Sequence, residues 1–243
     1  MEVILFVGCV VDQFFPETGM NAVKVMERLG FTVRVPGAAG CCGSPAWQHG
    51  QEEIACEVAS RCITELSGEI PIVVLSSDCR AMFGVNAPQL LHNGSAHHSV
   101  KTLQKRVFSF SSWVGQHAQT PMVKLVSNIS RVACHVSCCM QNEGIPQALT
   151  SLLTEWGGFT CVDVPRFSVC CGYGGGMFRS NPELSQSMAA QKLQAARAEG
   201  VEYIITEDMG CLMQLRAVAA QQTDLTWKPD RILHLADLIA EGL

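Results

Sequence analysis

Cysteine stands out in this chain, both in number and in spacing. The 243 residues include 13 cysteines. Eight of them form two series of the same pattern: a single cysteine, 31 residues, the triplet Cys-Cys-Gly and then one further cysteine. The series are Cys9, Cys41, Cys42 and Cys79, and Cys138, Cys170, Cys171 and Cys211. Four thiolates that converge on one point can hold an iron–sulfur cluster or a zinc ion.

The two series indicate an internal duplication. Moving the sequence by 129 residues places Cys9 on Cys138, and the triplet at Cys41 on the triplet at Cys170. A repeat at a fixed offset is the signature of repeated structural units. We therefore predict two copies of one unit, at residues 1–96 and 121–243, with a connecting helix at residues 97–120.

Predicted strands and helices alternate around the cysteines. Short apolar runs predict strands at Val3–Val7, Phe31–Val35, Ile70–Leu75, Arg131–Val136, Phe159–Val164 and Val201–Thr206. Apolar residues at helical spacing predict helices at Glu17–Leu29, Pro45–Leu66, Pro146–Trp156, Asn181–Glu199 and Leu212–Ala220, and the same spacing from Val100 to Val114 predicts the connecting helix. This alternation favours an α/β fold made of two tandem small α/β units with parallel sheets.

Each cysteine of the two series follows a predicted strand. The carboxyl ends of parallel strands share one edge of a sheet, so we expect the four cysteines of each unit to converge there. Glycines beside the cysteines, such as Gly43 and Gly172, let the backbone come close to a bulky ligand.

The adjacent cysteines favour an iron–sulfur cluster over zinc. Structural zinc sites commonly use C-x2-C pairs, whereas neighbouring cysteines point in different directions and suit different metals of a larger cluster. The alternatives are a zinc site, metal-free thiol chemistry, or cysteines that only pack in the core.

The same residues carry a family resemblance over nearly the whole chain. Six segments resemble the duplicated cysteine-rich CCG domain of the lactate-utilisation protein A family. These segments are FVGCVVDQFFPETG, GCCGSPAWQHG, SSDCRAMF, CHVSCCMQ, CCGYGGGMF and GCLMQL. The family is related to the CCG-containing subunit of heterodisulfide reductase and to the iron–sulfur subunit of glycolate oxidase. The heterodisulfide reductase type has a fifth cysteine per site, in a C-x2-C pair. Here Ser76 and Asp208 stand at that position, as is typical of the lactate-utilisation group.

The resemblance implies a redox function. It implies an iron–sulfur oxidoreductase subunit, with up to two clusters of the 4Fe-4S type, in a multi-protein system that oxidises L-lactate, or a similar 2-hydroxy acid such as glycolate, to the 2-oxo acid. Such a subunit is expected to be inactive without other iron–sulfur subunits as partners. The alternatives are a thiol/disulfide redox subunit of the heterodisulfide reductase kind and a zinc-stabilised scaffold without a redox role.

Other residues receive separate interpretations. His135 is a candidate catalytic residue because its counterpart in the first unit is Phe6, and the alternative is a hydrogen-bonded core histidine. Cys139 is a candidate ligand or redox thiol. The remaining cysteines are expected to pack as small apolar residues: Cys56, Cys62, Cys134 and Cys161.

Charge and apolar patterning limit the kinds of partner and the location that we expect for this protein. The net charge is −5 and no run of basic residues occurs, so nucleic acid is not expected. The first apolar run follows no basic region and ends within about ten residues, so we expect no signal peptide, no membrane span and a cytoplasmic location. No dinucleotide fingerprint is present. We expect a partner protein to dock near the cysteines, on Phe14–Gly19, Ala46–Gly50 and Tyr173–Arg179.

Overall fold

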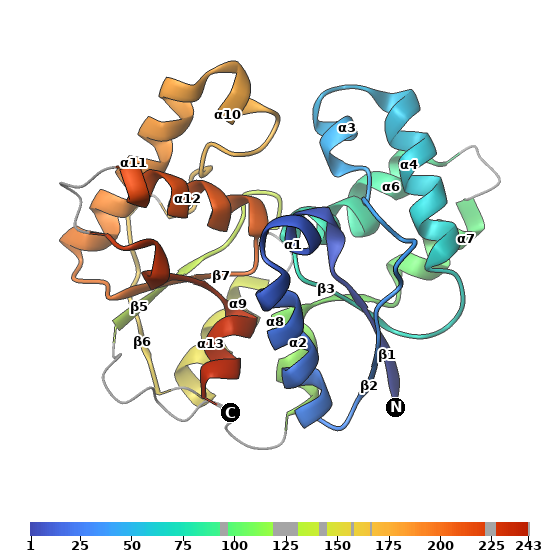
Figure 1. The fold of residues 1–243 in the computed structure, drawn as a ribbon, viewed down its shortest axis with the longest axis horizontal. Helices are drawn as coiled ribbons and strands as arrows, with labels where there is room; N and C mark the ends of the chain where they lie inside the picture. Colours follow the sequence, from blue (N-terminus) through green and yellow to red (C-terminus); the bar gives the residue numbers. More distant parts are fainter. Residues whose placement is uncertain are drawn as a thin grey trace.

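Two parallel sheets with the same strand order make up the fold (Figure 1). The computed structural model describes residues 1–92, 97–118, 131–140, 145–156, 158–165, 167–221 and 227–242. The first described sheet has the order β2-β1-β3-β4 and the second the order β6-β5-β7-β8, and all pairs are parallel. The prediction of an α/β fold with two tandem units is confirmed.

The strands are short and mostly buried. In the first half they are β1 (Glu2–Phe6), β2 (Thr32–Arg34), β3 (Ile72–Val74) and β4 (Val107–Ser109). In the second half they are β5 (Arg131–His135), β6 (Thr160–Cys161), β7 (Tyr203–Thr206) and β8 (Ile232–His234). Six of them overlap the predicted strands, and the edge strands β4 and β8 are additional.

Helices cover both sheets. The first half has α1 (Gly8–Phe14), α2 (Pro16–Arg28), α3 (Ser44–Gln48), α4 (Glu52–Glu65), α5 (Ser77–Ala81), the π-helical turn η1 (Met82–Asn86), α6 (Ala87–Leu90), α7 (His97–Gln104) and α8 (Phe110–His117). The second half has α9 (Ile145–Ser151), the π-helical turn η2 (Leu152–Trp156), α10 (Met177–Ser180), α11 (Pro182–Ala198), α12 (Met209–Gln221), the 3₁₀ turn η4 (Pro229–Arg231) and α13 (Leu235–Glu241). None of the helices in the described segments combines the length and the apolar character that crossing a bilayer requires.

Two helix predictions are wrong in detail. The single connecting helix at residues 97–120 is instead α7, β4 and α8, because Val107 pairs with Ile72 in the first sheet and Ser109 then caps α8 by accepting a hydrogen bond from the Ser112 amide. The helix at Pro45–Leu66 is divided into α3 and α4 by Gly50, whose φ is +69°. The unit boundaries near residues 96 and 120–121 fall outside the described residues and stay predictions.

The alternation of side chains along the strands builds three cores. Val3 and Leu5 of β1 face a central core between the two sheets, which also holds side chains of α2, α8, α9 and α13. Ile4 and Phe6 face the opposite way, into an outer core of the first half under α4 and α7. Ala133 of β5 faces the outer core of the second half under α11 and α12. Each sheet is thus buried on both faces, as parallel sheets require.

The last helix of each half packs on the other half. In the centre of Figure 1, α13 lies against α2, and α8 contacts α9. Thr18 and Asn21 of α2 donate hydrogen bonds to the Asp237 carboxylate of α13, at 2.9 and 3.0 Å. Glu207, after β7, accepts hydrogen bonds from the Ser111 amide and hydroxyl at 2.5 and 2.6 Å. Because α8 and α13 each pack on the other half, we call them the exchanged helices, and their contacts fix the position of one sheet relative to the other.

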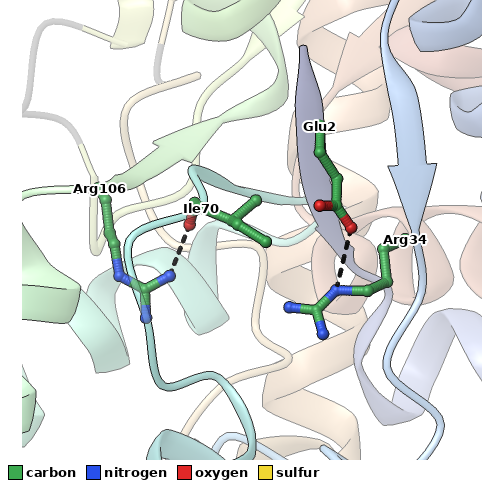
Figure 2. Close-up of polar contacts among 4 residues, drawn as sticks. All are labelled: Glu2, Arg34, Ile70 and Arg106. Carbon is green, nitrogen blue, oxygen red and sulfur yellow. Dashed lines mark hydrogen bonds and ion pairs between the residues drawn. The ribbon is translucent and has the colours of Figure 1, made fainter.

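Buried Arg106 fixes the strand that leads to Cys79. Its guanidinium donates to the Ile70 carbonyl at 2.6 Å, just before β3 (Figure 2). It also donates to the Leu66 carbonyl after α4. The other pair in Figure 2, Glu2 with Arg34 at 3.6 Å, joins β1 to β2 at an exposed edge. Such exposed ion pairs contribute little, so Arg106 is the more important of the two for the site.

Candidate functional site

The first series of cysteines converges at one point, which we call site 1. Cys9 lies in the first turn of α1, Cys41 and Cys42 precede α3, and Cys79 lies in α5. The sulfur atoms of Cys9 and Cys41 are 3.9 Å apart, and Cys42 is hydrogen-bonded to both Cys41 and Cys79. All four thiols lie at the carboxyl edge of the first sheet, where the sequence places them.

The second series converges in the same way and forms site 2. Cys138 follows β5, Cys170 and Cys171 precede α10, and Cys211 lies in the first turn of α12. Cys170 is hydrogen-bonded to Cys138 and Cys171, and Cys171 also contacts Cys211. The structure therefore brings together all eight cysteines in the two predicted sets.

The thiols within each site share protons. Hydrogen bonds from Cys42 and Cys9 lower the pKa of Cys41 to about 3, and the hydrogen bond to Cys41 raises the pKa of both partners. In site 2, hydrogen bonds from the neighbouring thiols lower the pKa of Cys170 to about 2. A bound metal must displace the remaining protons, because thiolates are the ligands.

The structure explains why each CCG triplet ends in glycine. Its amide donates a hydrogen bond to the first cysteine of the triplet, Gly43 to Cys41 at 3.4 Å and Gly172 to Cys170 at 3.3 Å. Both glycines have positive φ, +93° and +88°. A Cβ atom on Gly172 would lie 2.6 Å from the Ser185 carbonyl oxygen. The turn therefore aims an N–H group at a sulfur atom, which stabilises negative charge on a thiolate or cluster.

Two carboxylates, buried Asp208 and partly buried Asp78, connect the sites across the seam between the halves. Asp208 accepts hydrogen bonds from the Cys211 amide at 2.7 Å, the Asp78 amide at 3.2 Å and the Ser76 hydroxyl at 3.4 Å. Burial raises the pKa of Asp208, and burial together with Asp208 raises the pKa of Asp78 to about 7. The sequence marks Ser76 and Asp208 as replaced cysteines but gives no sign that they meet, because 132 positions separate them.

Cys139 points to this seam rather than into site 2. Its sulfur donates to an Asp78 carboxylate oxygen at 3.5 Å and lies 3.2 Å from the Ser137 hydroxyl. Partial desolvation at the seam and the negative charges of Asp208 and Asp78 raise its pKa. The structure thus separates the adjacent pair Cys138 and Cys139, and only Cys138 faces Cys170.

The other four cysteines pack with the cores as expected. Cys62 is buried in the outer core of the first half, and Cys56 packs against it. Cys134 and Cys161, on neighbouring strands, border the central core with their sulfur atoms 3.8 Å apart. None of the four is among the contacts that define site 1 or site 2.

His135 lies beside site 2. It is 1% exposed, and a ring nitrogen lies with the Cys171 and Cys211 sulfur atoms in a group whose members are within 4.8 Å of one another. Neither ring nitrogen has a hydrogen-bond partner within the part of the chain that the structure describes. The structure therefore does not show the hydrogen-bonded core histidine that was the alternative. Burial and the nearby Lys192 lower the pKa of His135 to about 3.

Lys192 is a buried cation that the sequence analysis did not identify. It is 2% exposed, and its ammonium group donates to the Phe167 carbonyl at 2.7 Å. Burial lowers its pKa, while the thiolates of site 2 oppose that shift. At the 129-residue offset the counterpart of Lys192 is Ile63. Comparing the two halves therefore shows a charged residue where the repeat has an apolar one, and this difference could have identified Lys192.

A pocket opens beside site 1 at the seam. It encloses about 650 Å³ including its mouth, and both halves contribute to its walls: Cys9, Cys42, Cys79, Gln48, His49, Asp78, Tyr173, Gly176, Phe178 and Gly210. The Gly175 amide donates to Gln48 at 2.8 Å, which joins the loop before α10 to α3. These two segments stand at the top of Figure 1, one on each half.

The donor set fits the metal group that the sequence implies. Each site has four thiols and an N–H group aimed at a thiolate, and site 2 also has a buried imidazole without a hydrogen-bond partner among the described residues. Sulfur ligands with hydrogen bonds to them are the usual setting of iron–sulfur clusters. Zinc accepts the same donors.

Fold and sites together define a class of protein: a duplicated α/β protein with one four-cysteine site at the carboxyl edge of each sheet. The chain belongs to the CCG cysteine-rich domain family, whose model matches residues 3–84 and 132–216. The first match contains all of site 1 and the second all of site 2. Two copies of the domain therefore account for the duplication.

Curated relatives align over almost the whole chain. A lactate utilization protein A from Bacillus pumilus is 28% identical over 98% of this chain and 99% of its own length. One from Anoxybacillus flavithermus is 29% identical over the same shares. Among solved structures, a hypothetical protein from Helicobacter pylori matches with a TM-score of 0.69 at 10% identity. That match covers 98% of this chain and 48% of the other, so this chain spans about half of it, and the likeness concerns the fold alone.

Proposed function

We propose that the chain is the iron–sulfur subunit of a multi-protein system that oxidises L-lactate, or a similar 2-hydroxy acid such as glycolate, to the 2-oxo acid. The observation that carries this proposal is the pair of four-thiol sites, each with an N–H···S bond at its CCG turn. The relatives named lactate utilization protein A, aligned over 98% of the chain, support lactate as the substrate of the system.

The eight converging cysteines would hold up to two clusters of the 4Fe-4S type. Such clusters, when bound, accept and release single electrons. The chain's own residues set the conditions for them. The Gly43 and Gly172 amides stabilise negative charge on sulfur, and buried Lys192 adds a positive charge beside site 2.

The proposed electron path needs a partner. Oxidation of a hydroxy acid releases two electrons, which one cluster does not take up in a single step. We propose that other iron–sulfur subunits dock on Phe14–Gly19, Ala46–Gly50 and Tyr173–Arg179. In support of this surface, the Phe14 side chain is 66% exposed and Phe178 is 39% exposed. A reducing compartment such as the cytoplasm keeps the free thiols available for clusters.

Metal analysis of protein purified without oxygen tests the cofactor. The expected result is iron and sulfide in amounts that correspond to two clusters per chain, with charge-transfer absorbance that bleaches on reduction. Zinc without iron would instead support a zinc-stabilised scaffold and contradict a redox role.

Growth tests the substrate. A strain that lacks this chain should lose growth on L-lactate and regain it with the wild-type gene, while growth on glucose is the control. The reconstituted chain alone should show negligible lactate-dependent dye reduction. Unimpaired growth on lactate, together with reduction of a heterodisulfide by the purified chain, would favour the thiol/disulfide redox alternative.

A further inference from the structure

His135 is buried in a way that hydrogen bonding does not explain. Its imidazole is 1% exposed, and neither nitrogen reaches hydrogen-bond geometry with any residue that the structure describes. Buried polar atoms in native proteins are nearly always paired, so each exception needs an explanation, and a bound ion is one of the recognised explanations.

The unpaired nitrogen lies next to two of the thiols in site 2. The nitrogen and the Cys171 and Cys211 sulfur atoms lie within 4.8 Å of one another. Donors that share a tetrahedral metal at the usual bond lengths are roughly 3.5–4 Å apart. The three atoms therefore need only a small inward movement to bind one metal atom.

Phe167 supplies the other neighbours of the ring. Its carbonyl lies near the imidazole, close enough to favour the protonated ring but without hydrogen-bond geometry. That carbonyl is held by Lys192 at 2.7 Å, and the Phe167 ring meets the imidazole edge-on at 5.8 Å between centroids. A nearby backbone carbonyl is a common partner of metal-bound histidine.

Site 1 has a phenylalanine at the equivalent position. The counterpart of His135 is Phe6, whose ring packs edge-on against Phe83 at 5.0 Å. Phe6 faces the outer core of the first half, and His135 lies two residues after Ala133, which faces the outer core of the second half, so this difference concerns the same strand position in each half.

Asp208 occupies the position of the missing fifth cysteine, and its carboxylate is already engaged. One oxygen accepts the Cys211 amide and the other accepts Ser76 and Asp78. The carboxylate is also hydrogen-bonded to the Cys211 thiol. His135 is the donor beside Cys171 and Cys211 whose nitrogens have no such partners among the described residues.

We propose that His135 is a nitrogen ligand of the metal group at site 2, beside the thiolates of Cys171 and Cys211, whereas site 1 is bound through cysteines alone. The inference rests on the proposed function only in that site 2 holds a metal. It makes the two sites chemically different despite their common origin.

Pulsed EPR on the full chain, reconstituted with iron and sulfide and then reduced, tests the inference. Wild-type protein should show a strongly coupled nitrogen whose signal changes when histidine is labelled with ¹⁵N. The signal should disappear in His135→Ala and persist in His49→Ala, the matched control beside site 1. In His135→Ala, a chelator should remove iron from one of the two clusters at least about tenfold faster than in wild type.

The outcomes separate this inference from the proposed function. Two clusters without any histidine nitrogen coupling, or a coupling abolished by His49→Ala and kept in His135→Ala, would overturn ligation by His135 and leave the iron–sulfur proposal intact. Zinc alone, with a nitrogen shell in X-ray absorption that His135→Ala removes, would uphold the ligand and overturn the iron–sulfur proposal. Binding of neither metal would overturn both. The labelled wild-type protein gives the main result, so the test does not depend on how the variant folds.

Discussion

The glycine of the CCG triplet is the residue that the structure explains most fully. Gly43 and Gly172 both have positive φ, and their amides point at a cysteine sulfur. They differ in the space around the missing Cβ. At Gly43 the nearest atom would be 3.2 Å away, and at Gly172 it would be 2.6 Å away. The triplet therefore requires glycine for backbone conformation in both halves, and for close packing most of all in the second.

A series of alanine substitutions should rank these effects. Gly172→Ala should lower the free energy of unfolding by roughly 2–4 kcal/mol, since a left-handed alanine costs about 1–2 kcal/mol and the overlap adds about as much. Gly43→Ala should cost less. The control is Gly175→Ala, where φ is +63° and no atom lies within 4 Å of the added Cβ, so only the backbone cost applies. Denaturant unfolding of metal-free protein measures all three, and an equal loss at Gly172 and Gly175 would refute the packing argument.

Buried Lys192 should tune site 2 electrostatically. The Lys192 ammonium interacts electrostatically with all four thiols of site 2. At an effective dielectric constant of about 20, two unit charges about 8 Å apart interact by roughly 2 kcal/mol. For a one-electron couple this is on the order of 100 mV. Lys192→Met should lower the reduction potential of one cluster by about that amount and leave the other unchanged. Redox titration followed by EPR measures both potentials, with Ile63→Met as the matched change near site 1. A shift of both clusters, or of neither, would contradict the assignment.

Among the secondary-structure elements, the sequence predicts the three strands that precede the cysteines in each half well, but it misses the fourth strand, β4 or β8. Six strands overlap the predicted ones, and α11 overlaps the predicted helix at Asn181–Glu199. The edge strands β4 and β8 have three residues each. In β4, Val107 lies in a continuous helical pattern of apolar residues, so no local signal distinguishes the strand. Its pairing with Ile72 of β3 decides its conformation.

The sequence predicts only those residues of the two sites that belong to the duplicated cysteine pattern. The duplicated pattern identifies all eight thiols: six of them recur at an offset of 129 residues, and the last pair, Cys79 and Cys211, recurs at 132. The links between the halves have no such signal. Asp208 meets Ser76, and Glu207 meets Ser111, through folding that brings distant segments together. Lys192 is neither part of the repeated pattern nor a contact between the halves. It can be recognised from the sequence because the equivalent residue of the first half, Ile63, is apolar.

The contact of Glu207 with the first turn of α8 should make stability depend on pH. Burial raises the pKa of Glu207 from about 4.5 to about 7. The folded state therefore binds this proton more tightly than the unfolded state. The stabilisation is complete below pH 4.5 and is lost as pH rises to 7, by about 3 kcal/mol.

Glu207→Gln isolates that dependence, because the variant keeps a neutral group at the position. Its stability relative to wild type should improve by about 3 kcal/mol between pH 4.5 and 7.5. Burial lowers the pKa of His234 to about 4, but that titration occurs in both proteins and cancels in the difference. Urea unfolding of metal-free protein across this pH range measures the effect. A difference that does not change with pH would show that Glu207 is charged in the folded state.

At the scale of the whole molecule, the halves interlock while their metal sites have separate ligands. Cys42→Ser and Cys171→Ser should each remove about half of the iron, because each cysteine belongs to only one site. Cys56→Ser, outside both sites, is the control and should keep all of it. Iron analysis and EPR distinguish the clusters. If either single substitution removed both, the sites would depend on each other, through the seam at Asp78 and Asp208.

The interlocking itself predicts that neither half folds alone. Phe110 and Trp113 of α8 belong to the same central core as Leu149 of α9, and Leu238 of α13 belongs there with Met26 of α2. A fragment of residues 1–120 would expose the apolar face of α2 that α13 covers, and residues 121–243 would leave α9 without α8. We expect each fragment expressed by itself to lack a cooperative unfolding transition, and the two expressed together to recover one and to purify as a pair. Circular dichroism during thermal unfolding is the measurement. If a fragment of residues 1–120 unfolds cooperatively as a monomer, the two halves are independent folding units, and the helix contacts between them are not needed for folding. If only the pair of fragments shows a cooperative unfolding transition, the duplicated halves are one folding unit.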